Sequence, residues 1–534
     1  MTESAEAKKP QTEMVFPDPQ GQLVYEPDDD GNCVPDFSYA GYKGGGVRLP
    51  DVPVKVALKA GAGNDAERIQ EAIDEVSQMP LDADGFRGAV LLERGLYNLD
   101  EPIWIRASGV VLRGEGPDED GTTLFGRGAI IDKKFGEDGS DAALVRIEGH
   151  GGRIETAETA QQIIAAFVPV GAQRFAVADS AAFLVGDSIL VRRLNTRAWY
   201  LALDLVIDHD NAPLPYEFDR IITAIDGNHI TIDAPLTCPI EARWGGGEVV
   251  KYTDSGRIEQ VGVEHLRGVS DFNRAARTTD YGNLDRRPFT GGEYYCDEDH
   301  YFEFIKIDNT RNCWVRDITA LHFANSVVYM EKGVKWCTVQ DCESLEPVSY
   351  CGGGRRFTFN ICGQLCLVQR CKSDKGRHSF VLGGRLTCGP NVFLDCSATR
   401  PFSSSEPHSS LIVGSLYDNV KAPIALRFAK SNPVRWMGIF NYLWNCEGGF
   451  LCQKPPVGQN YAFGQVGIHA LVYNTSLQEH KYENGHIESW DEHVEPQSLY
   501  LKQLEERLGK KALENIQYSP NLGDAQQGVS PASM

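Results

Sequence analysis

The sequence predicts an all-β protein: a right-handed parallel β-helix solenoid with an N-terminal capping helix, a small β insertion and a C-terminal helix. Three observations predict this fold class. The 534 residues include 54 glycines spread along the whole chain, which favours many short strands and turns. A strand motif recurs about every 26 residues, a period typical of solenoid coils. The hydrophobic content of 42% is enough for one long core.

The repeat is clearest in the middle of the chain. Four segments of similar pattern start at Trp314, Thr338, Leu367 and Val392. The apolar residue at the equivalent place in each is Ile318, Cys342, Cys371 and Cys396, at spacings of 24, 29 and 25 residues. Leu266 lies two such periods before Ile318. We expect these side chains to stack inside the solenoid as one internal ladder.

The N-terminal part predicts how the solenoid begins. Residues 64–76 carry the capping and apolar spacing of an amphipathic helix, and short strands follow from residue 88 to residue 113. Gly95-Leu-Tyr-Asn-Leu99, Val111-Leu-Arg-Gly-Glu-Gly116 and Thr122-Thr-Leu124 resemble the N-terminus of the pectate-lyase-like β-helix superfamily. The resemblance covers the first quarter of the chain. It implies the fold and a carbohydrate-active protein, and lyases, hydrolases and phage tailspikes share it.

Five regions are expected. Residues 1–50 form an N-terminal extension, and 51–154 the cap and first coils. Residues 155–252 alternate polar and apolar positions as β hairpins do, which predicts a β-rich insertion. Residues 253–480 form the main β-helix with the active-site groove. Residues 481–534 hold an amphipathic helix, docked on the final coils, and a tail.

Charge and cysteine content restrict the function classes. The formal charge of −22 argues against nucleic-acid binding, which depends on neutralising phosphates, and no apolar run is long enough to cross a membrane. An acidic polysaccharide could bind only in a locally basic groove. The fourteen cysteines are expected to be buried free thiols rather than disulfides, because several occupy the ladder position. We expect a secreted or periplasmic protein whose leader precedes this numbering, with a cytoplasmic location as the alternative.

The repeat alignment also predicts a column of ionisable side chains. Four residues after each ladder position come His322, Glu346, Lys375 and Arg400. Equivalent residues of successive coils stack about 4.8 Å apart in such a fold. A solvated surface ladder is the alternative to a functional site, but glycine-rich turns beside the column would let a ligand come close.

Basic residues gather in the turns next to this column. Arg355 and Arg356 follow Gly352-Gly-Gly, and Arg377, His378, Arg385 and His408 lie on neighbouring coils. Such a cluster in an acidic protein predicts an anionic substrate groove, with Arg355, Arg356, Arg385, His322 and His300 binding substrate. In a β-elimination, Lys375, Arg377 or His378 would act as base and His408 as acid.

An acidic run offers a second mechanism. Asp297-Glu298-Asp299-His300 precedes a strand. Glu298 with Glu346 would form the carboxylate pair of a glycoside hydrolase, or Asp297 and Asp299 would bind Ca²⁺, while a solvated loop is the alternative. The polygalacturonase motif blocks are incomplete here, and the pectate-lyase motif set is not evident.

Late aromatic residues complete the candidate set. Tyr442 and Trp444 could line sugar subsites, although core positions are the more common outcome. The sequence therefore favours a polysaccharide lyase acting on an acidic glycan. A glycoside hydrolase and a non-catalytic glycan-binding or adhesion protein stay open as alternatives.

Overall fold

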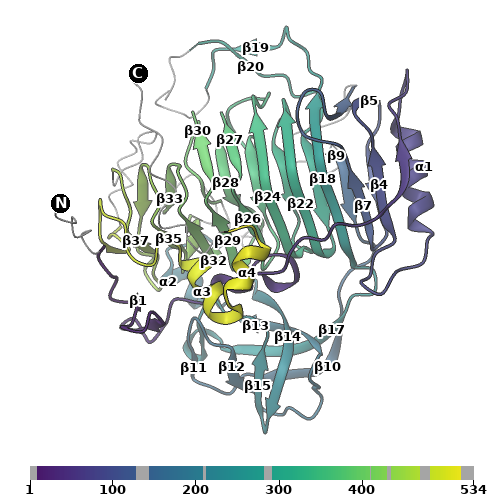
Figure 1. The fold of residues 1–534 in the computed structure, drawn as a ribbon. Helices are drawn as coiled ribbons and strands as arrows, with labels where there is room; N and C mark the ends of the chain where they lie inside the picture. Colours follow the sequence, from purple (N-terminus) through teal and green to yellow (C-terminus); the bar gives the residue numbers. More distant parts are fainter. Residues whose placement is uncertain are drawn as a thin grey trace, which may run out of the picture.

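The computed structural model describes residues 9–127, 143–207, 212–281, 292–408, 411–429, 435–468 and 482–518. The chain forms a right-handed parallel β-helix, as predicted: strands of successive coils pair in parallel to build two long sheets (Figure 1). Sheet 1 contains β3 (Val54–Leu58), β4 (Gly88–Leu92), β5 (Gly95–Leu99), β7 (Val110–Arg113), β8 (Thr122–Gly126), β18 (Ile258–Ser270), β22 (Thr310–Leu321), β24 (Lys335–Leu345), β26 (Leu367–Gln369), β27 (Lys372–Asp374), β29 (Cys388–Leu394), β30 (Ser397–Thr399), β32 (Ile412–Asp418), β34 (Gly438–Ile439), β35 (Tyr442–Trp444), β37 (Tyr461–Phe463) and β38 (His486–Glu488).

Sheet 2 closes the other side of the coil. Its strands, in spatial order, are β31 (Glu406–Pro407), β28 (His378–Leu382), β25 (Phe357–Ile361), β23 (Ser326–Met330), β21 (Glu303–Asp308), β9 (Ala143–Glu148) and β6 (Ile103–Ile105). In the later coils, β33 (Ile424–Leu426) pairs with β36 (Phe450–Cys452) in the same manner. The strands of sheet 2 are short because each coil must turn a corner every few residues.

Left-handed residues make the corners within sheet 1. In β22 the backbone has φ of +51° at Asn312 and +54° at Asp317, and β24 repeats this with +56° at both Trp336 and Asp341. Each such residue is skipped in the strand pairing and bends the strand. Stacking of the same bend in coil after coil offsets the conformational cost that a non-glycine residue carries there.

The predicted internal ladder is present. Leu266 pairs with Ile318 and Ile318 with Cys342, and Cys371 and Cys396 continue the same buried cluster. All fourteen cysteines are free thiols, and twelve of them are buried. The thiols therefore fill the core as small hydrophobic side chains.

The predicted β insertion leaves the helix between β9 and β18. It is an antiparallel sheet of β10 (Ile154–Gln162), β17 (Gly247–Thr253), β13 (Ser188–Arg193), β14 (Tyr216–Asp226), β15 (His229–Ile232) and β12 (Arg174–Ala176), with β11 (Phe167–Val168), β16 (Ile240–Glu241), α2 (Arg197–Ala202) and a 3-10 turn at Ala242–Trp244. It projects below the coils in Figure 1. A buried ion pair between Lys335 of β24 and Asp219 of β14, 2.9 Å apart, joins it to the helix.

A smaller excursion projects from the opposite side. It contains the short pair β19 (Arg277–Thr278) and β20 (Tyr294–Tyr295), which lies above the ends of the sheet 1 strands (Figure 1). The excursion connects β18 with β21, so it stands over the corner where sheet 1 passes into sheet 2.

The termini carry most of the helical structure. Helix α1 (Ala66–Ser77) buries Ile69, Ile73 and Val76 in the main core and lies at the N-terminal end of the coils (Figure 1). The tail forms two helices, α3 (Leu499–Leu508) and α4 (Lys510–Asn515), where one was predicted, because Gly509 at φ +77° separates them. They lie on sheet 1 beside the N-terminal segment, which holds β1 (Val15–Pro17), β2 (Leu23–Tyr25) and 3-10 turns at Phe37–Tyr39 and Tyr42–Gly44.

No helix in the described part of the chain is both long and apolar enough to span a bilayer.

Candidate functional site

Four of the residues selected from the sequence lie at the corner that leads from sheet 1 into sheet 2. The corner is built by the turns that follow β22, β24, β27 and β30. In each turn the first residue is left-handed: φ is +70° at His322, +48° at Glu346, +54° at Lys375 and +49° at Arg400. The same bend repeated in four coils directs these side chains along one line.

Glu346 is within ion-pair distance of both His322 and Lys375. His322 Nε2 lies 3.8 Å from Glu346 Oε2, and Lys375 Nζ lies 3.7 Å from Glu346 Oε1. Their side chains are 20%, 60% and 34% exposed, in chain order. The corner column of His322, Glu346 and Lys375 therefore joins three successive coils at the surface. Arg400 does not join these three residues, because its guanidinium binds Asp374 at 2.8 Å.

The imidazole of His322 is held neutral. Burial lowers its pKa below the ordinary value, and the nearby Arg274 adds to this effect while Glu346 opposes it. Its Nδ1 is buried and makes no hydrogen bond to any described residue. The ring packs edge-on against Phe272 at 5.0 Å, in the excursion above the corner. A neutral imidazole whose side chain is 20% exposed is suited to accept a proton.

The two arginines of the Gly352-Gly-Gly turn differ in position. Arg355 binds Glu298, with Nη2 2.6 Å from Oε2, at the edge of the corner. Arg356 is 2% exposed, and its guanidinium donates to the carbonyls of Ser349 and Lys375 and to the Ser349 hydroxyl. It braces the turns from inside, so the prediction that Arg356 contacts substrate is not supported.

The carboxylates of the acidic run are in different environments. Asp297 is buried and accepts hydrogen bonds from the amides of Asn273 and Asp299, and Asp299 is exposed. Within the described residues, neither carboxylate belongs to a group of three converging ligand atoms. His300 is also buried, with Nδ1 2.9 Å from Ser270 Oγ and Nε2 2.9 Å from the Val348 carbonyl. Both the Ca²⁺ expectation for Asp297 and Asp299 and the substrate contact expected of His300 lack geometric support.

The carboxylate pair expected for hydrolysis is committed to cations. Glu298 binds Arg355, and Glu346 lies between His322 and Lys375. Each carboxylate is therefore held by basic side chains of the neighbouring turns.

A second cluster lies on sheet 2, one strand further along. His378 begins β28, Glu406 lies on β31, and His408 follows two residues later. Glu406 is fully buried. Its Oε1 lies 2.8 Å from His408 Nδ1, and its Oε2 accepts from Arg427 Nε at 3.1 Å. Burial alone would raise the pKa of Glu406, but Arg427 and the adjacent imidazoles hold it well below its usual range.

Sequence reasoning missed Glu406 as a site residue. The residue belongs to a two-residue strand outside the aligned repeat, and its partner Arg427 comes a full coil later. The pattern Glu-x-His at 406 to 408 was the available signal, because alternate residues of a strand share a face.

The remaining residues predicted for the site lie at separate places in the fold. Arg377 donates to the Gly353 carbonyl and lies over the Phe357 ring, next to His378. Arg385 donates to the Ala212 carbonyl, at the insertion. Tyr442 and Trp444 are 1% and 0% exposed and pack under the N-terminal segment and the Pro496 carbonyl, so the structure places them in the core.

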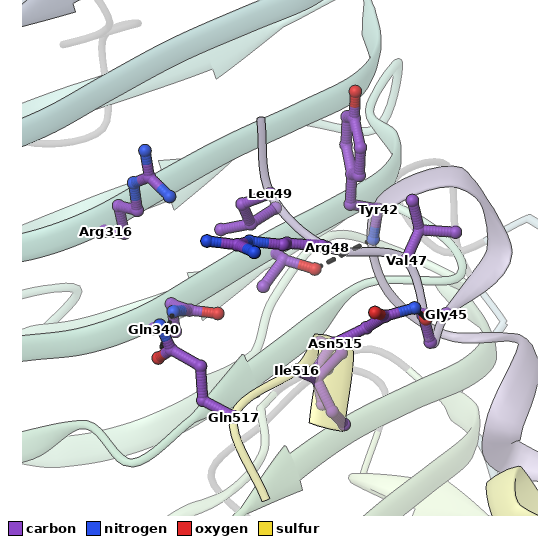
Figure 2. Close-up of a pocket in the computed structure, with 13 residues that line it drawn as sticks. Tyr42, Gly45, Val47, Arg48, Leu49, Arg316, Gln340, Asn515, Ile516 and Gln517 are labelled. Carbon is purple, nitrogen blue, oxygen red and sulfur yellow. Dashed lines mark hydrogen bonds between the residues drawn. The ribbon is translucent and has the colours of Figure 1, made fainter. Parts of the chain in front are cut away.

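Two cavities lie away from the corner. One of about 50 Å³ lies between the N-terminal segment, sheet 1 and the end of α4, and its labelled lining includes Arg48, Arg316 and Gln517 (Figure 2). It marks the seam where the termini rest on the sheet. A larger one of about 390 Å³ lies at the opposite ends of the sheet 2 strands, beside Glu148, Asp254 and Asp308. Neither contains a residue of the corner column.

Comparison with known proteins gives structural similarity only. No protein-family model matches the sequence, and no curated protein matches it. A tailspike of Acinetobacter baumannii bacteriophage AP22, solved with a capsular saccharide, is 12% identical over 76% of this chain and 56% of its own, with a TM-score of 0.42. A polygalacturonase from Erwinia carotovora is 9% identical over 79% of this chain and 95% of its own, with a TM-score of 0.37. The chain thus spans little more than half the length of the tailspike.

Proposed function

We propose that this protein cleaves an acidic polysaccharide by β-elimination at the corner column. The observation that carries the proposal is the column itself. His322 and Lys375 each lie within 3.8 Å of the Glu346 carboxylate, and the three residues come from successive coils and meet at the surface. The side chain of His322 is 20% exposed, so its ring reaches the protein surface.

The chemistry assigns one role to each residue. Neutral His322 removes the proton α to a uronate carboxyl, and the electron pair released forms a double bond to the β carbon. The glycosidic C–O bond at that carbon breaks, and the departing oxygen takes a proton from water. The Lys375 ammonium stabilises the negative charge that develops on the carboxyl. Glu346 holds both cationic and neutral partners in place.

Local charge supports an anionic substrate. The whole chain carries a formal charge of −22, so a polyanion is repelled from most of the surface. Lys375 belongs to the column, and the partly exposed Arg377 lies two residues after it. A polymer substrate would be met outside the cell, which accords with a secreted enzyme.

The test is an incubation with a panel of uronate-containing and sulfated polysaccharides, read by two assays. Ultraviolet absorbance reports unsaturated products, and a reducing-end assay reports every bond broken. We expect both signals to rise together on at least one polymer. Reducing ends without absorbance would replace elimination by hydrolysis. No cleavage of a polymer that binds measurably would favour a non-catalytic glycan-binding protein.

Two variants locate the reaction. His322→Gln should reduce kcat on the order of 100-fold or more, as loss of a general base does, with the melting temperature unchanged. The matched control is His265→Gln, which removes another partly exposed imidazole beside a carboxylate, Asp317, on sheet 1. Equal losses in both variants would rule out a specific role for His322.

A further inference from the structure

The three side chains of the second cluster converge. His378 and Glu406 lie on adjacent strands of sheet 2, and His408 lies on the same face as Glu406 because strand side chains alternate. One nitrogen from each imidazole and one oxygen of Glu406 all lie within 4.8 Å of one another. Among the described residues, no other three metal-ligating side chains converge in this way.

The ring of His378 packs against Phe357 and His408, and its two nitrogens are in different environments. Its Nδ1 lies 2.6 Å from the Ser404 carbonyl, which can only accept, so this nitrogen carries the proton. The lone pair is therefore on Nε2, which is buried and has no hydrogen-bond partner among the described residues. Histidines that bind metals are commonly fixed through the other ring nitrogen in this way.

Glu406 is fixed in orientation as well. Ser404 Oγ and Arg427 Nε each bind its Oε2 at 3.1 Å, and Oε1 is directed towards His408 Nδ1 at 2.8 Å. We propose that His378, Glu406 and His408 form a binding site for a first-row transition metal ion. Two imidazoles and one carboxylate favour ions that prefer nitrogen ligands, such as Zn²⁺ and Co²⁺, over Ca²⁺ and Mg²⁺, which prefer oxygen ligands throughout.

The experiment uses the full chain after chelator dialysis, titrated with CoCl₂ and followed by the visible absorption of bound cobalt. We expect one equivalent to bind, ZnCl₂ to displace it, and CaCl₂ to have no effect. X-ray absorption at the cobalt edge should report two imidazole nitrogens. The proposal is overturned if cobalt does not bind stoichiometrically, or if the bound cobalt has no imidazole ligand.

Variants assign the ligands. His408→Gln and His378→Gln should each weaken cobalt binding more than about 100-fold, beyond the 10- to 100-fold typical of residues behind the ligands. His408 is 19% exposed, so its variant should fold normally. His486→Gln is the matched control, because His486 also lies two residues from a glutamate, with Nε2 2.5 Å from Glu488 Oε1, but has no second imidazole in a converging group. Loss of binding in that control alone would also overturn the site.

The measurement contains no polysaccharide. The metal site therefore stands or falls separately from the elimination reaction proposed at the corner column.

Discussion

The proposed reactivity of His322 depends on the charges around one ring. Burial lowers the pKa of this imidazole first of all, Glu346 raises it, and Arg274 lowers it. The pH at which His322 becomes protonated sets the acid limb of the pH profile of kcat/KM, since only the neutral ring accepts a proton.

Two substitutions should move this limb in opposite directions. Glu346→Gln removes the charge that raises the pKa of His322, so the limb should shift to lower pH. Arg274→Ala removes a charge that lowers it, so the limb should shift to higher pH. NMR titration of the His322 ring without substrate checks the same shifts. A shift of both variants in one direction would contradict the proposed electrostatics.

Arg356 illustrates the opposite case, a charged side chain that serves stability. Arg356→Met should lower the free energy of unfolding by roughly 2–4 kcal/mol, because carbonyls of Ser349 and Lys375 lose their donor in a buried place. Denaturant unfolding measures this. The control Arg400→Met removes a guanidinium that is 54% exposed and should cost less than about 1 kcal/mol. Equal costs would show that Arg356 does not brace the turns.

The site was only partly predictable from the sequence. The corner column follows from the repeat, because a fixed period places equivalent residues in one line. The burial of Arg356, Tyr442 and His300 does not follow from it, since the segments that cover them come from elsewhere in the chain. Glu406 was missed because its role depends on Arg427, a contact between coils that no local pattern contains.

At the scale of elements, the left-handed bends within the sheet 1 strands explain why these strands are hard to recognise in the sequence. Inward residues are two apart within a straight strand but three apart across a left-handed residue, as from Val315 to Ile318 around Asp317. The alternation expected of a strand is therefore interrupted. The coil period survives this interruption, and the repeat rather than the alternation predicted the fold. The antiparallel strands of the β insertion contain no left-handed residue, and alternation was sufficient there.

The junction between insertion and helix should depend on one buried pair. Lys335 and Asp219 are 2% and 4% exposed, and Arg257 binds the same carboxylate at 2.8 Å. Lys335→Met should cost about 1–3 kcal/mol, because Asp219 and Asp233 lose a buried donor while Arg257 still pairs with Asp219. Thermal melting with limited proteolysis of the insertion measures the effect. Lys421→Met, which breaks a pair that is 58% and 42% exposed, should change stability little. A mild Lys335→Met variant would mean that apolar contacts alone hold the insertion.

At the scale of the whole molecule, the two ends of the chain meet on sheet 1. The Phe37 amide donates to Gln503 of α3 at 2.8 Å, and Arg507 donates to the carbonyls of Ser38 and Gly44 at 2.7 Å. Beneath them, Asp418 at the end of β32 accepts from Ser498 Oγ at 2.7 Å and from the Tyr500 amide at 2.8 Å. The buried Asp418 carboxyl thus binds the start of the C-terminal helices through two hydrogen bonds.

Asp418 should make the docking of these helices dependent on pH. Burial raises its pKa to about 8 and Asp395 adds to the increase, although the hydrogen bonds from Tyr500 and Ser498 oppose it. Its Oδ1 is buried without a partner among the described residues, as suits a protonated carboxyl. The folded state therefore holds a proton that the unfolded state releases near pH 4. Stability from this group is complete below that pH and is lost as pH rises to about 8.

Unfolding measured across this range should show the decline. Asp418→Asn, which keeps a neutral side chain of the same shape, should reduce the decline by a few kcal/mol. Asp341→Asn, at a partly exposed carboxyl paired with Arg370, should leave the slope unchanged. An unaltered slope in Asp418→Asn would mean that Asp418 is already ionised beneath the helices and that their docking is independent of its proton.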